Sequence, residues 1–261
     1  MRTGPAPLPP VAKRQLRWFE LYVRFYLRRN FHGLHLLRAG NLEETNGLPL
    51  LVCLNHPSWW DPLVTLYLSQ RFFGSRRQYA PIATAGLEKY KFFERLGFFS
   101  IDPATRAGAA RFLSLGEAVL SLPDGGLWVT VQGEFTDVRR RPITMAPGVG
   151  HLAHRAGRFC MLPLALEYSF WNERYPEAFA CFGSAVMVEN GRDRRPAEWT
   201  DLFSSALIST QDLLSECVER RDASAFEPLI EGNAGVGGVY DLWRAAEARL
   251  RGKRWQPEHG R

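Results

Sequence analysis

A histidine and an aspartate lie five positions apart in the stretch NHPSWWDP, residues 55–62. In an extended strand, five residues at about 3.3 Å each would hold the two side chains roughly 16 Å apart. A tight turn would instead bring the Asp61 carboxylate onto the His56 imidazole and orient one ring nitrogen. Because a general base needs a neutral, oriented imidazole, this arrangement would support acid–base chemistry.

The same stretch has the composition of a helix start. Pro62 suits the first helical turn and Asp61 suits the N-cap, while Ser58 or Asp61 can accept hydrogen bonds from free backbone N–H groups. The positive end of such a helix would oppose protonation of His56. If the stretch is only a helix start, the histidine is incidental, and both interpretations stay open at this point.

Short apolar runs alternate with helical patterns around this stretch. The expected strands are residues 50–54, 79–85, 97–101, 126–132, 160–168 and 179–183. The expected helices between them are residues 62–73, 87–97, 106–122 and 148–157. This alternation predicts an α/β sheet covered by helices. From residue 190 the pattern is mostly helical, with a Gly-rich loop over 232–238 before a short helix and a basic tail.

The net charge of +6 is concentrated at the N-terminus, and the rest of the chain is electrically neutral. Residues 13–31 interleave basic and aromatic side chains without glycine or proline, which predicts a helix. Its apolar stripe consists of Leu16, Phe19, Val23, Tyr26 and Leu27. Such a helix can lie in the headgroup region of an anionic leaflet. The alternatives are that the stripe packs on the body of the protein, or that the segment binds nucleic acid, although no nucleic-acid module follows.

Several other classes of site find no support in the sequence. The four cysteines show no CxxC spacing, which fits a reducing compartment and predicts neither a zinc knuckle nor a disulfide framework. Phosphate-binding loops, dinucleotide fingerprints and hydrolase elbows do not occur. The N-terminus lacks a secretory h-region, and no apolar stretch is long enough to cross a bilayer. We therefore expect an intracellular protein without a metal, cofactor or nucleic-acid partner.

The motif NHPSWWD resembles the first motif, N-H-x-S-x-x-D, of the phospholipid/glycerol acyltransferase superfamily, which includes the lysophosphatidic acid acyltransferases. Three later stretches resemble the following motifs in order: LGFFSIDPATRAG, WVTVQGEFT and APGVGHLAHRAGRFCMLPLALEY. The resemblance implies an α/β fold with a mixed central sheet flanked by helices, and an acyltransferase core over residues 45–190. A Pro-rich tip and basic amphipathic helix, residues 1–44, would precede this core, and a helical extension, residues 191–261, would pack on it.

The resemblance also implies an activity, namely transfer of a fatty acyl group from a thioester to a hydroxyl of a lipid-like acceptor. The donor would be acyl-CoA or acyl-carrier protein, and the protein would sit peripherally on the cytoplasmic face of a membrane through residues 13–31. His56 would act as the general base and Asp61 would orient it. The implied substrate-binding residues are Asn55, Ser58, Arg106, Gly133, Glu134, Thr136 and Arg139. A thioester or lipid hydrolase using the same base, and a catalytically silent lipid-binding protein, are the alternatives.

The chain departs from the family pattern where an acceptor phosphate would bind. Phe135 replaces the usual glycine of the third motif, and Asp137 occupies the usual arginine position. In the second motif, Pro103 follows Asp102 where an arginine is common. Because the family associates those arginines with the acceptor's phosphate, the departures predict an acceptor without a terminal phosphomonoester.

Overall fold

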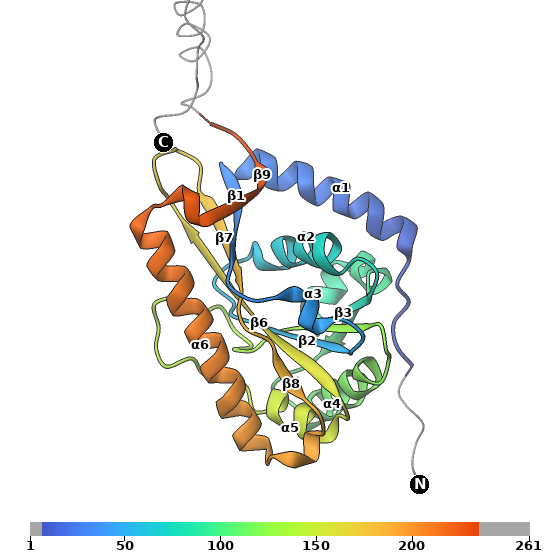
Figure 1. Ribbon diagram of the computed structural model, residues 1–261. Helices are drawn as coiled ribbons and strands as arrows, with labels where there is room; N and C mark the ends of the chain where they lie inside the picture. The colour runs from blue at the N-terminus through green and yellow to red at the C-terminus, as the bar shows by residue number, and fades with distance from the viewer. Residues whose placement is uncertain (1–6, 235–261) are drawn as a thin grey trace, which may run out of the picture.

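The computed structural model of the protein describes residues 7–234 and shows one mixed sheet between two layers of helices (Figure 1). The sheet strands are β1 (Gly33–Arg38), β2 (Leu50–Leu54), β3 (Arg77–Ala83), β4 (Phe98–Ile101), β5 (Gly125–Thr130), β6 (Phe159–Ser169), β7 (Glu177–Phe182), β8 (Val186–Val188) and β9 (Phe226–Glu231). The helices are α1 (Lys13–Asn30), α2 (Asp61–Phe73), α3 (Thr84–Lys89), α4 (Arg106–Leu120), α5 (Gly148–Arg155) and α6 (Pro196–Arg220). Short 3-10 turns cover Leu42–Thr45, Lys91–Arg95, Gly191–Asp193 and Ala223–Ala225.

The strands follow the order β4-β3-β5-β2-β6-β7-β1-β9, and β8 pairs with the first part of β6. From β4 to β6 all neighbours are parallel, whereas β7 runs antiparallel to β6 and β9 antiparallel to β1. The α/β fold with a mixed central sheet is therefore confirmed. The carboxyl ends of β2, β5 and β6 meet at one edge, where ligands of open α/β sheets usually bind.

Alternation along β2 explains the two helical layers. Leu50, Val52 and Leu54 face the cluster that includes α1 and α2, while Leu51 and Cys53 face the cluster of α4, α5 and α6. All five residues of the strand are buried, as expected for a parallel strand covered on both faces. β2 therefore lies in the middle of the core, which fixes the residues that follow it.

Three strands were not predicted from the sequence. β1 and β9 lie outside the expected core of residues 45–190, yet they pair with each other and extend the sheet beyond β7. β1 follows α1 almost directly, and β9 contains Pro228, which weakens its strand signal. β8 has only three residues. The expected helix over 87–97 is instead α3 followed by a 3-10 turn, and the short helix and basic tail at the C-terminus lie outside the described residues.

The apolar stripe of the N-terminal helix packs on the body of the protein. Leu16, Val23 and Leu27 are buried in the same cluster as α2, and Phe19 and Tyr26 pack against it. The structure therefore favours the alternative in which this stripe packs on the body of the protein, and contact of residues 13–31 with a membrane stays a prediction. The outward faces of α1 carry a second set of apolar side chains that remain exposed, namely Trp18, Leu21, Tyr22 and Phe25.

Candidate active site

A turn at the end of β2 brings His56 and Asp61 into contact. The Asp61 N–H donates to the Ser58 carbonyl oxygen, which closes a turn over residues 58–61. As a result, His56 Nδ1 lies 2.6 Å from Asp61 Oδ2, so the contact expected from the spacing is present. Pro62 occupies the first turn of α2 as predicted. The N-cap, however, is Trp60 and not Asp61, because the Asp61 carboxylate turns back toward the histidine and the Ser58 N–H.

The Asp61 carboxylate is fully buried and accepts three hydrogen bonds. Its Oδ2 atom accepts from the Ser58 backbone N–H at 3.1 Å and faces His56, while its Oδ1 atom accepts from the Tyr168 hydroxyl at 2.7 Å. An ionised carboxylate can only accept, so Nδ1 of His56 carries the proton. The other ring nitrogen, Nε2, bonds to nothing among the described residues, and the side chain is 18% exposed. In the neutral imidazole, this bond therefore leaves Nε2 as an open hydrogen-bond acceptor.

Tyr168 is one of two residues of this site, with Gln132, that the sequence analysis missed. β6 pairs with β2 only up to Leu164 opposite Leu54, and then continues to Ser169, so Tyr168 lies beyond the end of β2 beside the turn. Burial, and then the charge of Asp61, raise the pKa of Tyr168 well above its usual range. The hydroxyl therefore stays a neutral donor. The expected strand over 160–168 is longer than the expected strand over 50–54, and this difference was the clue in the sequence.

Asn55 and Gln132 fasten the end of β2 to its two neighbours. The Asn55 amide is buried, donates to the Leu166 carbonyl oxygen and accepts from the Leu166 N–H, both at 2.8 Å. Gln132 Oε1, just past β5, accepts from the His56 N–H at 2.8 Å. Because both polar atoms of Asn55 are engaged with β6, its position favours holding His56 in place over contact with a substrate.

The loop after β5 places further predicted residues beside His56. The Thr136 N–H donates to the His56 carbonyl oxygen at 2.9 Å, and the Thr136 hydroxyl donates to the Glu134 carbonyl oxygen at 3.3 Å. Gly133 has a φ of 73°, which glycine adopts without strain, and both it and Glu134 are exposed. Phe135, which is 61% exposed, lies with its ring centroid 4.4 Å from that of His56.

Two of the three arginines of this loop, Arg139 and Arg141, are held in ion pairs. Arg139 donates from Nε and Nη2 to Asp137, and this bond holds the pKa of Asp137 below its usual range. Arg141 pairs with Asp212 on α6 at 2.7 Å. Arg139 is thus near the site in sequence, but its guanidinium is engaged by the residue that stands in the family's arginine position.

Arg106 and Ser58 are the remaining predicted binding residues. Arg106 is exposed at the start of α4, after β4, and β4 is the third strand from β2. At about 4.8 Å per strand, the ends of β2 and β4 lie roughly 14 Å apart, and none of the hydrogen bonds around His56 and Asp61 involves Arg106. Ser58 Oγ accepts from the Trp60 N–H at 3.3 Å, a bond within the turn.

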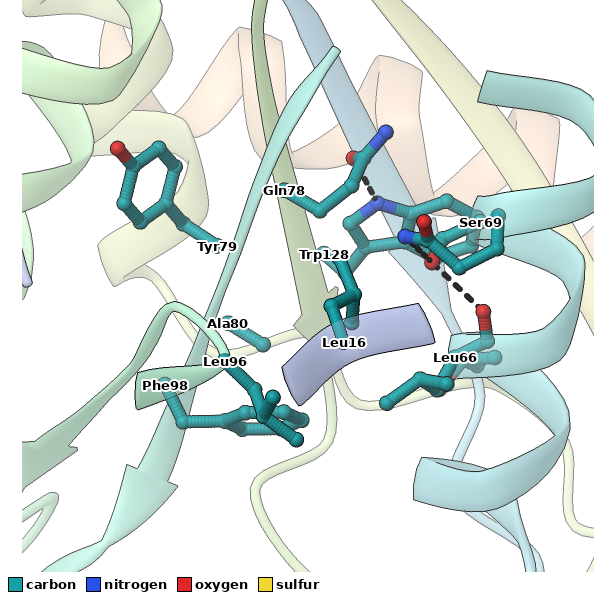
Figure 2. Close-up of a pocket in the computed structure, with 11 residues that line it drawn as sticks. Leu16, Leu66, Ser69, Gln78, Tyr79, Ala80, Leu96, Phe98 and Trp128 are labelled. Atoms are coloured by element: carbon teal, nitrogen blue, oxygen red, sulfur yellow. Dashed lines mark hydrogen bonds between the residues drawn. The ribbon is translucent and has the colours of Figure 1, made fainter. Parts of the chain in front are cut away.

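Neither the cysteines nor a small cavity near α1 contributes a contact to the His56–Asp61 pair. All four cysteines are free, and burial raises the pKa of Cys160 to about 11 and of Cys181 to about 12, so these thiols stay protonated. A cavity of about 40 Å³ between α1, α2 and β3 includes the Trp128–Gln78 bond but neither His56 nor Asp61 (Figure 2). It is too small for a long acyl chain. Within residues 7–234, no three His, Cys, Asp or Glu side chains are arranged to hold a metal ion.

Comparison with known proteins supports the fold class. No protein-family model matches the sequence, and no curated protein matches it. The structure is similar to the crystal structure of the 1-acyl-sn-glycerophosphate (LPA) acyltransferase PlsC from Thermotoga maritima, with a TM-score of 0.50 and 13% identity. The match covers 81% of this chain and 80% of that chain. At this identity the likeness concerns the fold alone.

Among the described helices, none is both long and apolar enough to cross a membrane.

The Tyr168 bond can be tested by the stability of Tyr168→Phe. Because the lost bond is to a buried charge, we expect the free energy of unfolding in urea to fall by about 1.5–3 kcal/mol. Tyr67→Phe is the matched control, since Tyr67 donates to the neutral Leu229 carbonyl oxygen and its loss should cost about 0.5–1.5 kcal/mol. Because the pKa of Tyr168 is raised in the folded protein, its contribution to the free energy of unfolding is fully present below about pH 10. This contribution is lost as the pH rises through the raised pKa. Equal effects of the two substitutions would contradict the charged acceptor.

Proposed function

We propose that the protein is an O-acyltransferase that moves a fatty acyl group from a thioester to a hydroxyl of a lipid-like acceptor. The observation that carries this proposal is the His56–Asp61 pair, with Nε2 free, at the carboxyl end of β2. A fold similar to that of an LPA acyltransferase supports it. The thioester, acyl-CoA or acyl-carrier protein, is a substrate, and the chemistry needs no cofactor.

The pair would act in both halves of the reaction. Nε2 of His56 takes the proton of the acceptor hydroxyl as its oxygen attacks the thioester carbonyl carbon. Asp61 stabilises the imidazolium that forms, and the Tyr168 and Ser58 donors keep the carboxylate in place. Collapse of the tetrahedral intermediate breaks the C–S bond, and the proton on Nε2 passes to the leaving thiolate. The products are an ester and a free thiol.

The loop after β5 supports an acceptor without a phosphomonoester. Phe135 covers part of the His56 ring, which places an apolar surface where the acceptor approaches. Asp137 would repel a phosphate dianion, and Arg139 is already paired with it. Gly133, Glu134 and Thr136 remain the proposed contacts for the acceptor's polar groups, whereas Ser58 and Asn55 would position the turn.

We further propose that α1 binds the surface of an anionic membrane through its outward faces. At 100° per residue, Arg17, Arg24 and Arg28 share one flank, while Trp18 and Tyr22 share the other. The exposed aromatics continue onto Tyr90 and Phe92 after α3 and onto Trp59 beside the catalytic turn. Ring contacts of 5.1–5.6 Å link these groups, through Phe19–Phe92, Tyr22–Tyr26, Tyr26–Trp60 and Trp59–Trp60. Aromatic side chains flanked by arginines suit the headgroup boundary, and this surface leads to His56.

His56→Ala tests the reaction. We expect kcat/KM for acyl transfer from labelled acyl-CoA to mixed lipid acceptors to fall by about 10²–10⁴, because the general base is lost. His151→Ala is the matched control, since His151 is exposed on α5 and should leave the rate unchanged. Retained transfer in His56→Ala would refute the base assignment. Release of free fatty acid without an acylated lipid would show a hydrolase, and no turnover by the unaltered protein would favour a silent lipid-binding protein.

The acceptor class is tested by restoring the family residues in the loop. We expect Phe135→Gly with Asp137→Arg to raise kcat/KM for a lysophosphatidate, relative to an uncharged lipid alcohol, by about tenfold or more, because a like-charge contact is removed. Glu189→Arg is the control, because it makes the same charge reversal far from the loop. Glu189 follows β8, which pairs with the start of β6, whereas Tyr168 lies near the end of β6. This control should not change the ratio of kcat/KM for the two acceptors. A wild-type preference for lysophosphatidate would contradict the proposed acceptor class.

The membrane surface is tested by removing exposed aromatics. Trp18→Ser with Tyr22→Ser should weaken sedimentation with anionic vesicles by about tenfold or more, since each buried aromatic contributes about 1.5–3 kcal/mol. Met187→Ser with Leu213→Ser removes exposed apolar side chains from β8 and α6 and should have no such effect. Similar binding by both double variants would place the contact surface elsewhere.

A further inference from the structure

A groove of about 620 Å³ lies between the outward side of α1 and the chain that follows β9. Its lining consists of Leu21, Arg24, Phe25, Arg28, Arg29, Gly232 and Asn233. His56, Asp61 and the loop after β5 do not contribute to it. The groove is therefore a feature separate from the proposed catalytic site.

Backbone hydrogen bonds fix the wall opposite the arginines. The Gly232 N–H donates to the His32 carbonyl oxygen and the Asn233 N–H to the Phe31 carbonyl oxygen, at 2.7 and 3.1 Å. The Asn233 amide also donates to the Arg29 carbonyl oxygen at 2.8 Å. A Cβ atom at Gly232 would overlap the Phe31 carbonyl oxygen, so this close approach needs glycine. The groove is thus built by β9 returning to the end of α1.

The three arginines of the groove are exposed, and within residues 7–234 they form no ion pair. This holds although Glu20 lies one helical turn before Arg24, and Glu231 directly precedes Gly232 of the opposite wall. Eight other described arginines, including Arg139 and Arg141, do have carboxylate partners. Guanidinium groups bind phosphate oxygens through paired N–H donors, so several of them around one groove favour an anionic phosphate ligand.

We propose that this groove binds the phosphodiester of an anionic lipid headgroup while the lipid remains in the leaflet. The exposed Leu21 and Phe25 side chains support a lipid over a free phosphate, because a small soluble anion would leave both in water. The proposal rests on the membrane contact proposed for α1 and specifies its partner. The arginines then select the headgroup, and the neighbouring aromatics enter the boundary below it.

The test compares two double variants of the same helix with equal loss of charge. Arg28→Gln with Arg29→Gln removes two groove arginines, and Arg14→Gln with Arg17→Gln removes two exposed arginines outside the groove. The probe is binding to phosphatidylcholine vesicles with and without phosphatidylglycerol. We expect the groove variant to lose about tenfold more affinity for phosphatidylglycerol vesicles than the control, whose loss should follow from net charge alone. Equal losses would refute the proposed headgroup site, because vesicle binding would then depend only on the net charge of α1.

Two further measurements separate the other outcomes. If inorganic phosphate at matched ionic strength displaces the unaltered protein from the vesicles, the site is one for free phosphate and the lipid assignment is wrong; we expect no displacement. Urea unfolding of the groove variant should have the same midpoint as that of the control variant, which shows that the loss of vesicle binding does not come from misfolding. If neither the unaltered protein nor any variant transfers acyl groups, the proposed reaction is wrong. The difference in vesicle binding between the two double variants still tests the proposed headgroup site.

Discussion

The burial of the Asp61 carboxylate is the constraint on which the rest of the site depends. Removing a charge from water costs several kcal/mol unless hydrogen bonds and an opposite charge or dipole compensate. Here the donors come from three parts of the chain: the turn itself, His56 at the end of β2 and Tyr168 near the end of β6. The start of α2 adds a favourable dipole. The carboxylate is therefore stable only where strand, turn and helix are all in place, and it holds them together in return.

The same packing connects the turn over residues 58–61 to α1. The Phe31 ring, just after α1, lies 4.8 Å from Trp60 and 5.8 Å from Tyr168, measured between ring centroids. Tyr26 also packs on Trp60. The end of the helix proposed to lie on a membrane thus forms part of the support for the residues around Asp61. A lipid acceptor that reaches His56 from that surface would follow aromatic side chains and would not have to cross open water.

Local patterns in the sequence predicted much of this arrangement, and long-range pairing accounts for what was missed. The run LLVCL before Asn55 and the helix signal after Asp61 predicted β2, the turn and α2, because each depends on neighbouring residues. Tyr168 could not be placed, since it is 107 residues from Asp61 and meets it only through the pairing of β6 with β2. Likewise, the apolar stripe of α1 has the same periodicity whether it faces a core or a membrane. Only the position of α2 decides between them.

The distribution of free and paired arginines bears on how the protein would recognise phosphate. In the loop after β5, Arg139 and Arg141 are paired with Asp137 and Asp212, and Phe135 packs against the imidazole of His56, while Arg140 has no carboxylate partner among the described residues. On α1, Arg24, Arg28 and Arg29 likewise form no ion pair with the described residues, and all three line one groove. A phosphate would therefore find more unpaired guanidinium groups at the proposed membrane surface than in the loop beside the His56–Asp61 pair. Charge recognition and acyl transfer would then be separate tasks, with the headgroup held by α1 and an uncharged hydroxyl presented to Nε2.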